Sequence, residues 1–566
     1  MEKRNHAAAD AEAEAAESID LFEYLILRIK EVGVQSIHGV PGDFNLTALD
    51  YISKCGLRWI GNCNELNAGY AADGYARVNG ISALMTIMGV GELSALNALA
   101  GSYAEYIPVI HIVCMPSRRA QADRLCLHHT FGDGDFGVFQ KLSAAVSCMT
   151  AVLDCPHRAA GLIDEAVRTC WVRRRPVCLF VPADMIRGSV FSGGRLERGL
   201  DLRGPGNDAE VQRRVVETIM GELRRARSPV VLVGGYAVRH HLQDEVLGLV
   251  KALAVPVLVS ASGRGIVDES HPLYSGLYVG NCSEPQVLGL MQSTDLVVSI
   301  GNIQSDLGTA GFSGQVSSND MVDLQMNRIC VRGELYPNIN VKPLLQTLIA
   351  RVESSYLSPR CSWDTEVSVV SSSRHPKTSQ HCWFKRLLKP EPIQHDWLWP
   401  MMGSWLRDDD VILAEAGTAS FGIWKTQFRA GTIFIAQYLW ASIGFTVGAC
   451  QGASLAVQDS VNSHRRTILF VGDGSLQVAC QELSTILRYG LAPIIFVICN
   501  NGYTIERLIH GPENEYNDIQ PWKYRRLPAV FGAQSAQYRS HQVHTKRQLQ
   551  RLLNRKSFSD CSRLQV

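Results

Sequence analysis

An apolar strand runs directly into the turn at residues 472–475, Gly-Asp-Gly-Ser, and an amphipathic helix is expected to begin near Gln477. Ligands of open α/β sheets bind at such strand ends. The glycines let the backbone approach a phosphate, the helix N-terminus favours its negative charge, and Asp473 offers a hard oxygen ligand. The turn therefore predicts a metal–diphosphate site, although Gly-Asp-Gly is equally typical of a purely structural turn.

A second motif supports the metal site. The next apolar strand, Pro-Ile-Ile-Phe-Val-Ile-Cys, ends in Asn-Asn-Gly-Tyr-Thr-Ile-Glu, so Asn500 follows Asp473 by about one helix and one strand. Both side chains then reach the same sheet edge. Asp473, the Asn500 amide oxygen and the Gly502 carbonyl would supply half of an octahedral shell for Mg²⁺, which phosphate oxygens and water complete.

Three further groups could handle protons. Glu65 opens a helix in Gly-Asn-Cys-Asn-Glu-Leu-Asn-Ala-Gly-Tyr, among small and apolar residues. On its own, Glu65 is better interpreted as a helix-capping carboxylate. Asp43 lies in Gly-Val-Pro-Gly-Asp-Phe, and His128 and His129 stand together in Leu-His-His-Thr-Phe-Gly-Asp-Gly-Asp-Phe. Carboxylic acids beside imidazoles can donate and accept protons near neutral pH.

Taken together, these strings resemble the fungal-type pyruvate decarboxylases, which are thiamine-diphosphate enzymes related to indolepyruvate and other 2-oxo acid decarboxylases. The resemblance runs from about Asp20 to the end of the chain. It implies that Glu65 hydrogen-bonds the cofactor's aminopyrimidine ring. It also implies that Asp43, His128, His129 and Glu506 surround the substrate and manage protons after carbon dioxide leaves.

The resemblance also implies a cofactor-binding set. Thr418 matches a cofactor contact in Ala-Glu-Ala-Gly-Thr-Ala-Ser-Phe-Gly, and Ile443 matches the bulky residue that bends thiamine diphosphate. The whole set is Glu65, Thr418, Ala441, Ser442, Ile443, Gly474, Ser475, Asn500, Gly502, Tyr503, Thr504 and Ile505, with Asp473, Asn500 and Gly502 holding Mg²⁺.

Several positions depart from the family pattern. Ala441 replaces a glycine, which is tolerated if its φ is negative. Ala416 and Ser420 replace a threonine and an alanine near the reacting centre, and Leu307 replaces an aromatic residue that narrows the pocket. Bulky Ile505 and Ile509 keep the opposite wall, so a small 2-oxo acid is expected.

Two more departures concern regulation and the chain end. Tyr236 and Tyr106 stand where a cysteine and a facing histidine serve substrate activation, so that activation is expected to be lost. The chain stops at Ser-Arg-Leu-Gln-Val, where the family continues with a last strand and a closing helix. A missing strand would leave an unpaired sheet edge.

Short apolar strands alternate with amphipathic helical stretches along most of the chain, which is typical of α/β folds with parallel sheets. We expect a disordered tail at 1–19 and a pyrimidine-binding α/β domain at 20–188. A Rossmann-like middle domain at 205–353, a linker at 354–382 and a truncated diphosphate-binding domain at 383–566 follow. The predicted class is thus α/β with three consecutive, mainly parallel sheets, of which the first and third have the thiamine-diphosphate-binding fold.

Composition narrows the partners. The chain has 55 basic and 54 acidic residues, so no net field attracts nucleic acid or an anionic membrane. No apolar run is long enough to span a membrane, and the acidic N-terminus resembles neither a secretory signal nor a transit peptide. Scattered cysteines predict reduced thiols, without disulfides or a zinc site. We expect a cytoplasmic protein.

The favoured interpretation is non-oxidative decarboxylation of pyruvate by a homodimer or homotetramer whose active sites lie at the subunit interface, as the resemblance implies. Alternatives are a longer or aromatic 2-oxo acid substrate, a carboligase of the acetohydroxyacid synthase type, and an inactive truncated paralogue that regulates a related decarboxylase.

Overall fold

The computed structural model describes residues 18–355, 390–461, 464–560 and 562–566. They form two compact units. The first holds the described residues of 1–203, 440–540 and 563–566, and the second holds those of 204–439 and 541–562. The predicted N-terminal tail at 1–19 and linker at 354–382 lie almost entirely outside the described residues.

The N-terminal part of the first unit is built on a six-stranded sheet in the order β3-β2-β4-β5-β7-β6, in which all neighbours are parallel. The central strand β5 is buried along its whole length, because parallel sheets are covered on both faces. The strands are β2 Ser36–Gly39, β3 Arg58–Gly61, β4 Ser82–Ile87, β5 Val109–Met115, β6 Met149–Val152 and β7 Val177–Pro182.

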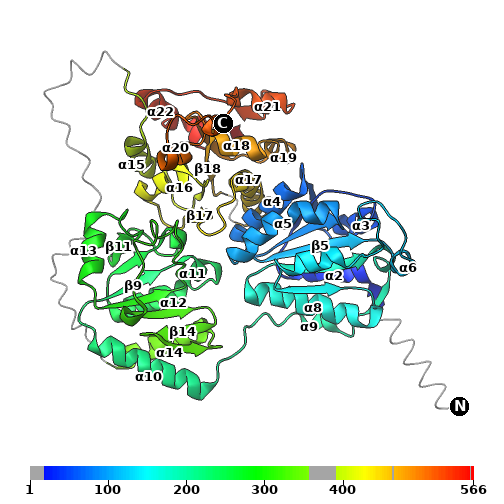
Figure 1. Cartoon of the computed structure of the whole chain (residues 1–566), viewed down its shortest axis with the longest axis horizontal. Coiled ribbons are helices and arrows are strands. Elements are labelled where there is room, and N and C mark those ends of the chain that lie inside the picture. Colours follow the sequence, from blue (N-terminus) through cyan, green and yellow to red (C-terminus); the bar gives the residue numbers. More distant parts are fainter. Residues whose placement is uncertain (1–17, 356–389, 462–463, 561) are drawn as a thin grey trace. The chain divides into compact units, whose positions relative to one another are not determined.

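Helices cover both faces of this sheet (Figure 1). Ile110 and Ile112 of β5 pack with α2 and α8 on one face, while Val109 packs with α4 and α5 on the other, as the period of two in a strand requires. The helices are α2 Leu21–Glu31, α3 Leu46–Lys54, α4 Glu65–Asn79, α5 Val90–Ala104, α6 Arg118–Ala122, α7 Val138–Ala144, α8 Pro156–Arg173 and α9 Arg195–Arg198. A separate antiparallel pair joins β1 Ser18–Asp20 to β8 Ser189–Phe191.

The second unit contains a seven-stranded sheet in the order β11-β10-β9-β12-β13-β14-β15. It is parallel from β11 to β13, and β14 and β15 continue it antiparallel. Its strands are β9 Pro229–Val233, β10 Val257–Val259, β11 Tyr274–Leu277, β12 Leu296–Ile300, β13 Met321–Gln325, β14 Arg328–Val331 and β15 Glu334–Pro337. Its helices are α10 Ala209–Arg225, α11 Gly235–Arg239, α12 Gln243–Leu253, α13 Pro285–Ser293 and α14 Val341–Ser354.

The C-terminal third of the chain contributes elements to both units. The second unit holds α15 His395–Trp405, β16 Val411–Ala414, α16 Thr418–Gly422, β17 Ile433–Ile435, α22 Lys546–Leu553 and α23 Lys556–Ser559. The first unit holds α17 Phe445–Asp459, β18 Thr467–Gly472, α18 Asp473–Ala479, α19 Glu482–Arg488, β19 Ile494–Ile498, α20 Thr504–His510, α21 Leu527–Val530, β20 Tyr538–Arg539 and β21 Leu564–Gln565. These strands are also parallel, which confirms the predicted α/β class with mainly parallel sheets.

Helices α4 and α17 of the first unit pack backbone to backbone. A Cβ added to Gly452 of α17 would lie 1.8 Å from the Ala71 carbonyl oxygen of α4, and one added to Gly74 of α4 would lie 2.1 Å from the Ala449 carbonyl. Only glycine permits this approach. The contact fixes the start of α4, which carries Glu65, relative to the segment that enters α17.

The structure differs from two sequence-based predictions about the C-terminal third of the chain. The helix after the Gly-Asp-Gly-Ser turn begins at Asp473 rather than near Gln477, since only Gly472 is extended. The edge of β19 is also not left bare: β21, at Leu564–Gln565, pairs with both β19 and β20. Among the described residues, no helix combines the length and apolar character needed to cross a membrane.

Candidate active site

Asp473 lies at the junction of β18 and α18 and is only 3% exposed. Oδ1 accepts a hydrogen bond from the Gly474 N–H at 2.9 Å, and Oδ2 accepts one from the Asn501 N–H at 2.9 Å. The two donors belong to the turns after two neighbouring parallel strands. The carboxylate is therefore held at the carboxyl edge of the sheet, where α/β proteins bind ligands.

Asn500 and Gly502 meet Asp473 at this edge. One terminal atom of the Asn500 amide lies 3.1 Å from Asp473 Oδ1 and 3.3 Å from the Gly502 carbonyl oxygen, and the other lies 2.8 Å from Thr504 Oγ1. With its nitrogen turned inward, the amide hydrogen-bonds both oxygens. With its oxygen turned inward, three oxygens converge, and a cation would stabilise them. The donor set fits Mg²⁺, which prefers oxygen ligands.

Glycine is required on both sides of this oxygen cluster. A Cβ on Gly474 would lie 2.9 Å from the Tyr503 ring, and one on Gly502, whose φ is 110°, would lie 2.3 Å from the Asn517 carbonyl oxygen. The predicted cofactor residues Ser475, Thr504 and Ile505 follow in the same two turns, with Ser475 buried and Thr504 and Ile505 half-buried.

The segment 440–443 is pinned to α4 and α5. Ser442 Oγ lies 2.5 Å from the Tyr70 hydroxyl and accepts from Asn97 Nδ2 at 3.3 Å, while Trp440 Nε1 donates to Asn97 Oδ1 at 3.1 Å. Within it, Ala441 has φ 52°, so the negative φ under which an alanine would be tolerated without strain is not found. For a residue with a Cβ the left-handed region costs about 1–2 kcal/mol.

Glu65 is the first residue of α4 and is half-buried. The preceding Asn64 caps the helix by accepting from the Asn67 N–H at 2.8 Å, so Glu65 is not needed as the cap. A Cβ added to Gly91 of α5 would lie 3.0 Å from Glu65 Oε1. In the part of the chain that the structure describes, the Glu65 carboxylate makes no hydrogen bond or ion pair, so it is available to a ligand.

Asp43 and the histidine pair form a compact cluster. His128 Nε2 lies 2.8 Å from Asp43 Oδ2, and the rings of His128 and His129 lie 4.4 Å apart between centroids. Phe44 stacks on His128 at 5.2 Å. His129 is held at φ 63°, with its carbonyl oxygen 2.1 Å from where a Cβ on Gly89 would stand. Three of the predicted proton-handling residues are therefore together, with Asp43 and His128 exposed and His129 half-buried.

Other predicted residues are not joined to these groups. Glu506 is exposed on α20, a helix without buried residues, and Ile509, expected to form a pocket wall, is 74% exposed. Over the described residues, no hydrogen bond or ion pair links Glu506 to the histidines or Glu65 to Asp473. Thr418 belongs to the second unit, at the start of α16.

Glu92 is a buried acid that the sequence motifs did not point to. Glu92 in the first turn of α5 is fully buried; Oε2 accepts from the Gly89 N–H at 3.5 Å, and Oε1 accepts from the Ser143 hydroxyl. Burial raises the pKa of Glu92 to about 7. Glu92 thus holds the turn that touches the His129 backbone, and its neighbour Gly91 faces Glu65. A glutamate three residues after a helix N-cap is the signal that could have found it.

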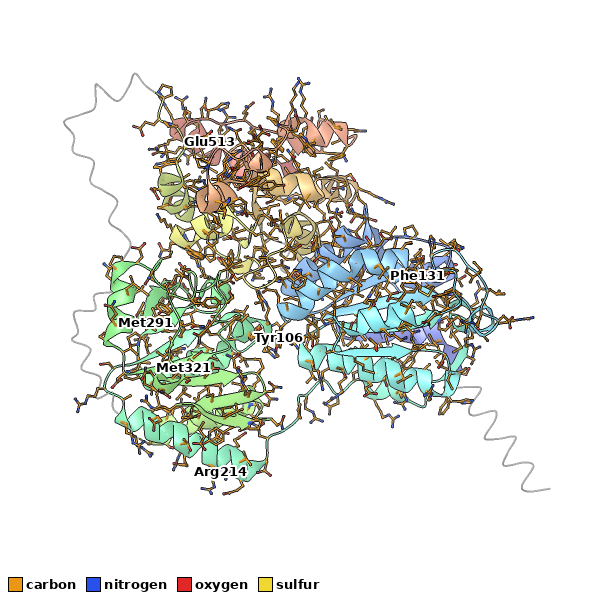
Figure 2. All side chains as sticks on the ribbon, in the orientation of Figure 1. Tyr106, Phe131, Arg214, Met291, Met321 and Glu513 are labelled. Atoms are coloured by element: carbon orange, nitrogen blue, oxygen red, sulfur yellow. The ribbon has the colours of Figure 1, made fainter. Side chains whose placement is uncertain are left out.

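The departures from the family pattern fall in both units. Tyr106, labelled in Figure 2, lies after α5 with the Arg175 guanidinium 4.0 Å from its ring centroid. In the second unit, Ser420 Oγ donates to the Gly417 carbonyl at 3.0 Å, and Ala416 and Leu307 are half-buried.

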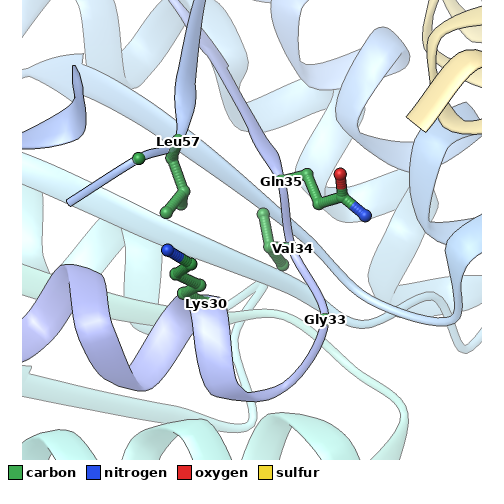
Figure 3. A pocket seen from close by; sticks show the side chains of 6 residues that line it. Lys30, Gly33, Val34, Gln35 and Leu57 are labelled. Carbon is green, nitrogen blue, oxygen red and sulfur yellow. The ribbon is translucent and has the colours of Figure 1, made fainter. Parts of the chain in front are cut away.

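A cavity of about 270 Å³ in the first unit is lined by none of these residues (Figure 3). Its lining comes from residues 33–35 and 56–57, which lead into β2 and β3, together with Lys30. It therefore opens at the amino edge of the sheet, whereas Asp43 and Glu65 follow the carboxyl ends of the same two strands. Parallel α/β sheets bind their ligands at the carboxyl edge, so this cavity is not the substrate site.

Comparison with known proteins defines the class of this fold and site. Three family profiles match the chain: the thiamine pyrophosphate enzyme N-terminal TPP binding domain at residues 19–138, the central domain at 216–341 and the C-terminal TPP binding domain at 415–560. A solved Rhodococcus jostii thiamine diphosphate-dependent 4-hydroxybenzoylformate decarboxylase has the same fold, with a TM-score of 0.73 over 97% of this chain and 98% of that one. Its sequence is 18% identical.

Full-length relatives narrow the class. The chain is 47% identical to a pyruvate decarboxylase of Aspergillus fumigatus, over 98% of this chain and 95% of that protein. It is 41% identical to pyruvate decarboxylase isozyme 1 of Saccharomyces cerevisiae, over 97% of this chain and 94% of that one. The chain belongs to the pyruvate decarboxylase family of thiamine-diphosphate enzymes, which confirms the resemblance drawn from its motifs.

Proposed function

We propose that the chain is a thiamine-diphosphate-dependent decarboxylase that converts pyruvate to acetaldehyde and carbon dioxide. The observation that carries the proposal is the meeting of Asp473, Asn500 and Gly502 at one sheet edge, in a chain of this family. The bulky side chain of Ile505 supports a small 2-oxo acid, whereas Leu307 in place of an aromatic residue leaves room for a longer one.

The proposed cofactor would be held by three groups of residues. Asp473, the Asn500 amide oxygen and the Gly502 carbonyl would bind Mg²⁺, and the turn at Gly474 and Ser475 would bind the diphosphate. Thr418, Ala441, Ser442, Ile443, Tyr503, Thr504 and Ile505 would contact the rest of thiamine diphosphate. When bound, thiamine diphosphate supplies an electron sink for the carbanion that forms as carbon dioxide leaves.

The chain's own residues would move the protons. Glu65 would hydrogen-bond the aminopyrimidine ring, and its lack of another partner among the described residues keeps its carboxylate available. Asp43 and His128, whose Oδ2 and Nε2 lie 2.8 Å apart, would exchange a proton with the substrate, with His129 and Glu506 completing the set. Such acid–base pairs contribute about 10²–10⁴-fold to a rate.

Glu65 and Asp473 would act on one cofactor across a subunit interface. The resemblance to pyruvate decarboxylases supports this arrangement, a homodimer or homotetramer in which each subunit supplies one of the two carboxylates. Mixed dimers of Glu65→Gln and Asp473→Ala chains are expected to regain part of the activity that each variant lacks. No recovery in verified mixed dimers would contradict the shared site.

The proposed compartment is the cytosol.

The decisive experiment measures acetaldehyde release from pyruvate by the purified protein, coupled to an alcohol dehydrogenase. Activity should require both thiamine diphosphate and Mg²⁺. A parallel series with longer and aromatic 2-oxo acids tests the substrate, since Leu307 predicts some activity with longer chains. Intact cofactor binding without turnover of any of these acids would overturn the proposal and favour a regulatory paralogue.

A further inference from the structure

The cluster of Asp43, His128 and His129 has the geometry of a metal site as well as of a proton relay. One donor atom from each side chain lies within 4.8 Å of the other two. Asp43 Oδ2 and His128 Nε2 are 2.8 Å apart. Ligands bonded to one Zn²⁺ at its usual bond lengths stand roughly 3.4 Å apart, so this pair already has nearly the spacing of two ligands. His129 supplies the third donor atom, within 4.8 Å of the other two.

The surroundings hold the cluster in place and leave it accessible. The His129 backbone is fixed by its contact with Gly89, and Phe44 stacks on the His128 ring. The side chains of Asp43 and His128 are 49% and 57% exposed, so an ion can reach them without opening the fold. Two ring nitrogens and one carboxylate leave further coordination positions for water.

We propose that Asp43, His128 and His129 form a second cation site, selective for a first-row transition ion such as Zn²⁺, whose occupation inhibits the enzyme. Imidazole nitrogens bind Zn²⁺, Co²⁺, Ni²⁺ and Cu²⁺ well, whereas Mg²⁺ prefers oxygen. The cluster around Asp473 offers oxygen atoms alone. The two sites would therefore sort cations by ligand chemistry within one unit of the chain.

Inhibition follows from the lone pairs that the ion occupies. A bound ion takes up the Asp43 carboxylate and the ring nitrogens of both histidines, the atoms that would otherwise accept and donate protons. Protons and the ion then compete for the same atoms. This inhibitory part rests on the proposed decarboxylase function, whereas binding of the ion does not.

Binding is tested with Co²⁺, whose visible absorption reports its ligands, in the full-length protein with thiamine diphosphate and excess Mg²⁺. One equivalent should bind with d–d bands typical of nitrogen ligation, and Zn²⁺ should displace it. His129→Asn, which keeps a residue suited to φ 63°, and Asp43→Asn should each weaken binding about 100-fold or more. His157→Ala, an exposed imidazole on α8, should leave the bands unchanged.

Two results would overturn the binding site: Co²⁺ bands that persist unchanged in both His129→Asn and Asp43→Asn, or bands lost in Asp473→Asn, which would place the ion at the oxygen cluster. Zn²⁺ should also lower pyruvate turnover at fixed excess Mg²⁺, with recovery on adding a zinc-selective chelator. Turnover that ignores bound Zn²⁺ would overturn the inhibitory part. Co²⁺ binding by a protein without turnover would support the site while contradicting the proposed function.

Discussion

Two groups of predicted site residues in the first unit are built in opposite ways. Asp473 is 3% exposed and accepts hydrogen bonds from two backbone N–H groups, whereas the side chains of Asp43 and His128 are 49% and 57% exposed, with Oδ2 and Nε2 2.8 Å apart. The first group sits in turns between buried strands and helices. The second sits in loops.

This difference in burial matches the function proposed for each group. A metal–diphosphate site gains from ligands that are already in place, because little ordering cost remains when the ligand binds. Side chains that exchange protons with the substrate must be accessible to it. Changes in the buried group should therefore alter cofactor binding and stability together, while changes in the exposed group should alter turnover alone.

The largest effect is expected from Asp473→Ala. It removes a proposed Mg²⁺ ligand and leaves the Gly474 and Asn501 N–H groups without their acceptor; for the buried Gly474 donor this costs about 1–3 kcal/mol. Affinity for Mg²⁺–thiamine diphosphate, measured by titration calorimetry, should fall at least ~100-fold, and the free energy of unfolding should fall as well. Unchanged cofactor affinity would contradict the site.

His128→Ala and Asp43→Asn should separate turnover from stability. Each removes an exposed proton-handling group, so kcat should fall about 10²–10⁴-fold, while the free energy of unfolding should change by less than about 0.5 kcal/mol. Stopped-assay kinetics and denaturant unfolding measure the two quantities. A large loss of stability in either variant would show that the exposed group also supports the fold.

Gly502→Ala tests the backbone of the buried group. Its φ of 110° and a Cβ 2.3 Å from the Asn517 carbonyl oxygen should lower the free energy of unfolding by about 1–3 kcal/mol and weaken cofactor binding. Gly532→Ala is the matched control, because Gly532 also has a positive φ, 82°, but nothing within 4 Å of an added Cβ. Equal effects in the two variants would refute the steric contribution.

Glu92→Gln should change how stability depends on pH. Because the folded pKa of Glu92 is raised to about 7 from 4.5, the folded state keeps this proton in the window where the unfolded state has lost it. Its contribution is therefore full below about pH 4.5 and declines by up to about 1.4 kcal/mol per pH unit as pH rises to about 7. In Glu92→Gln, the free energy of unfolding measured from pH 5 to 8 should lose this dependence on pH. An unaltered slope would contradict the raised pKa of Glu92.

The smallest effect is expected from Ala441→Gly. Glycine relieves the left-handed φ of 52°, but it also gains entropy in the unfolded chain, so the net gain in stability should be at most about 1 kcal/mol. Thermal unfolding with and without cofactor measures it. A loss of stability on this substitution would show that the alanine methyl packs usefully.

Local sequence was enough to predict the α/β class and the two turns that hold Asp473 and Asn500. A buried parallel strand is an apolar run, and the turn after its last residue lies at the carboxyl edge of the sheet, whatever the rest of the chain does. Adjacency along the chain likewise brought His128 next to His129. These features depend on neighbours in sequence, so a pattern can reveal them.

Other features depend on neighbours in space. The contact of Asp43 with His128, the position of Glu92 beneath the His129 turn, the φ of Ala441 and the pairing of β21 with β19 each arise from packing between distant segments. Apart from Glu92, whose place after a helix N-cap is a local signal, these features have no local pattern, because each depends on contacts between segments that are distant in the sequence. The sequence by itself therefore determined which residues could do chemistry and which turns carry them. The distances between these residues and their burial were decided only by the tertiary structure.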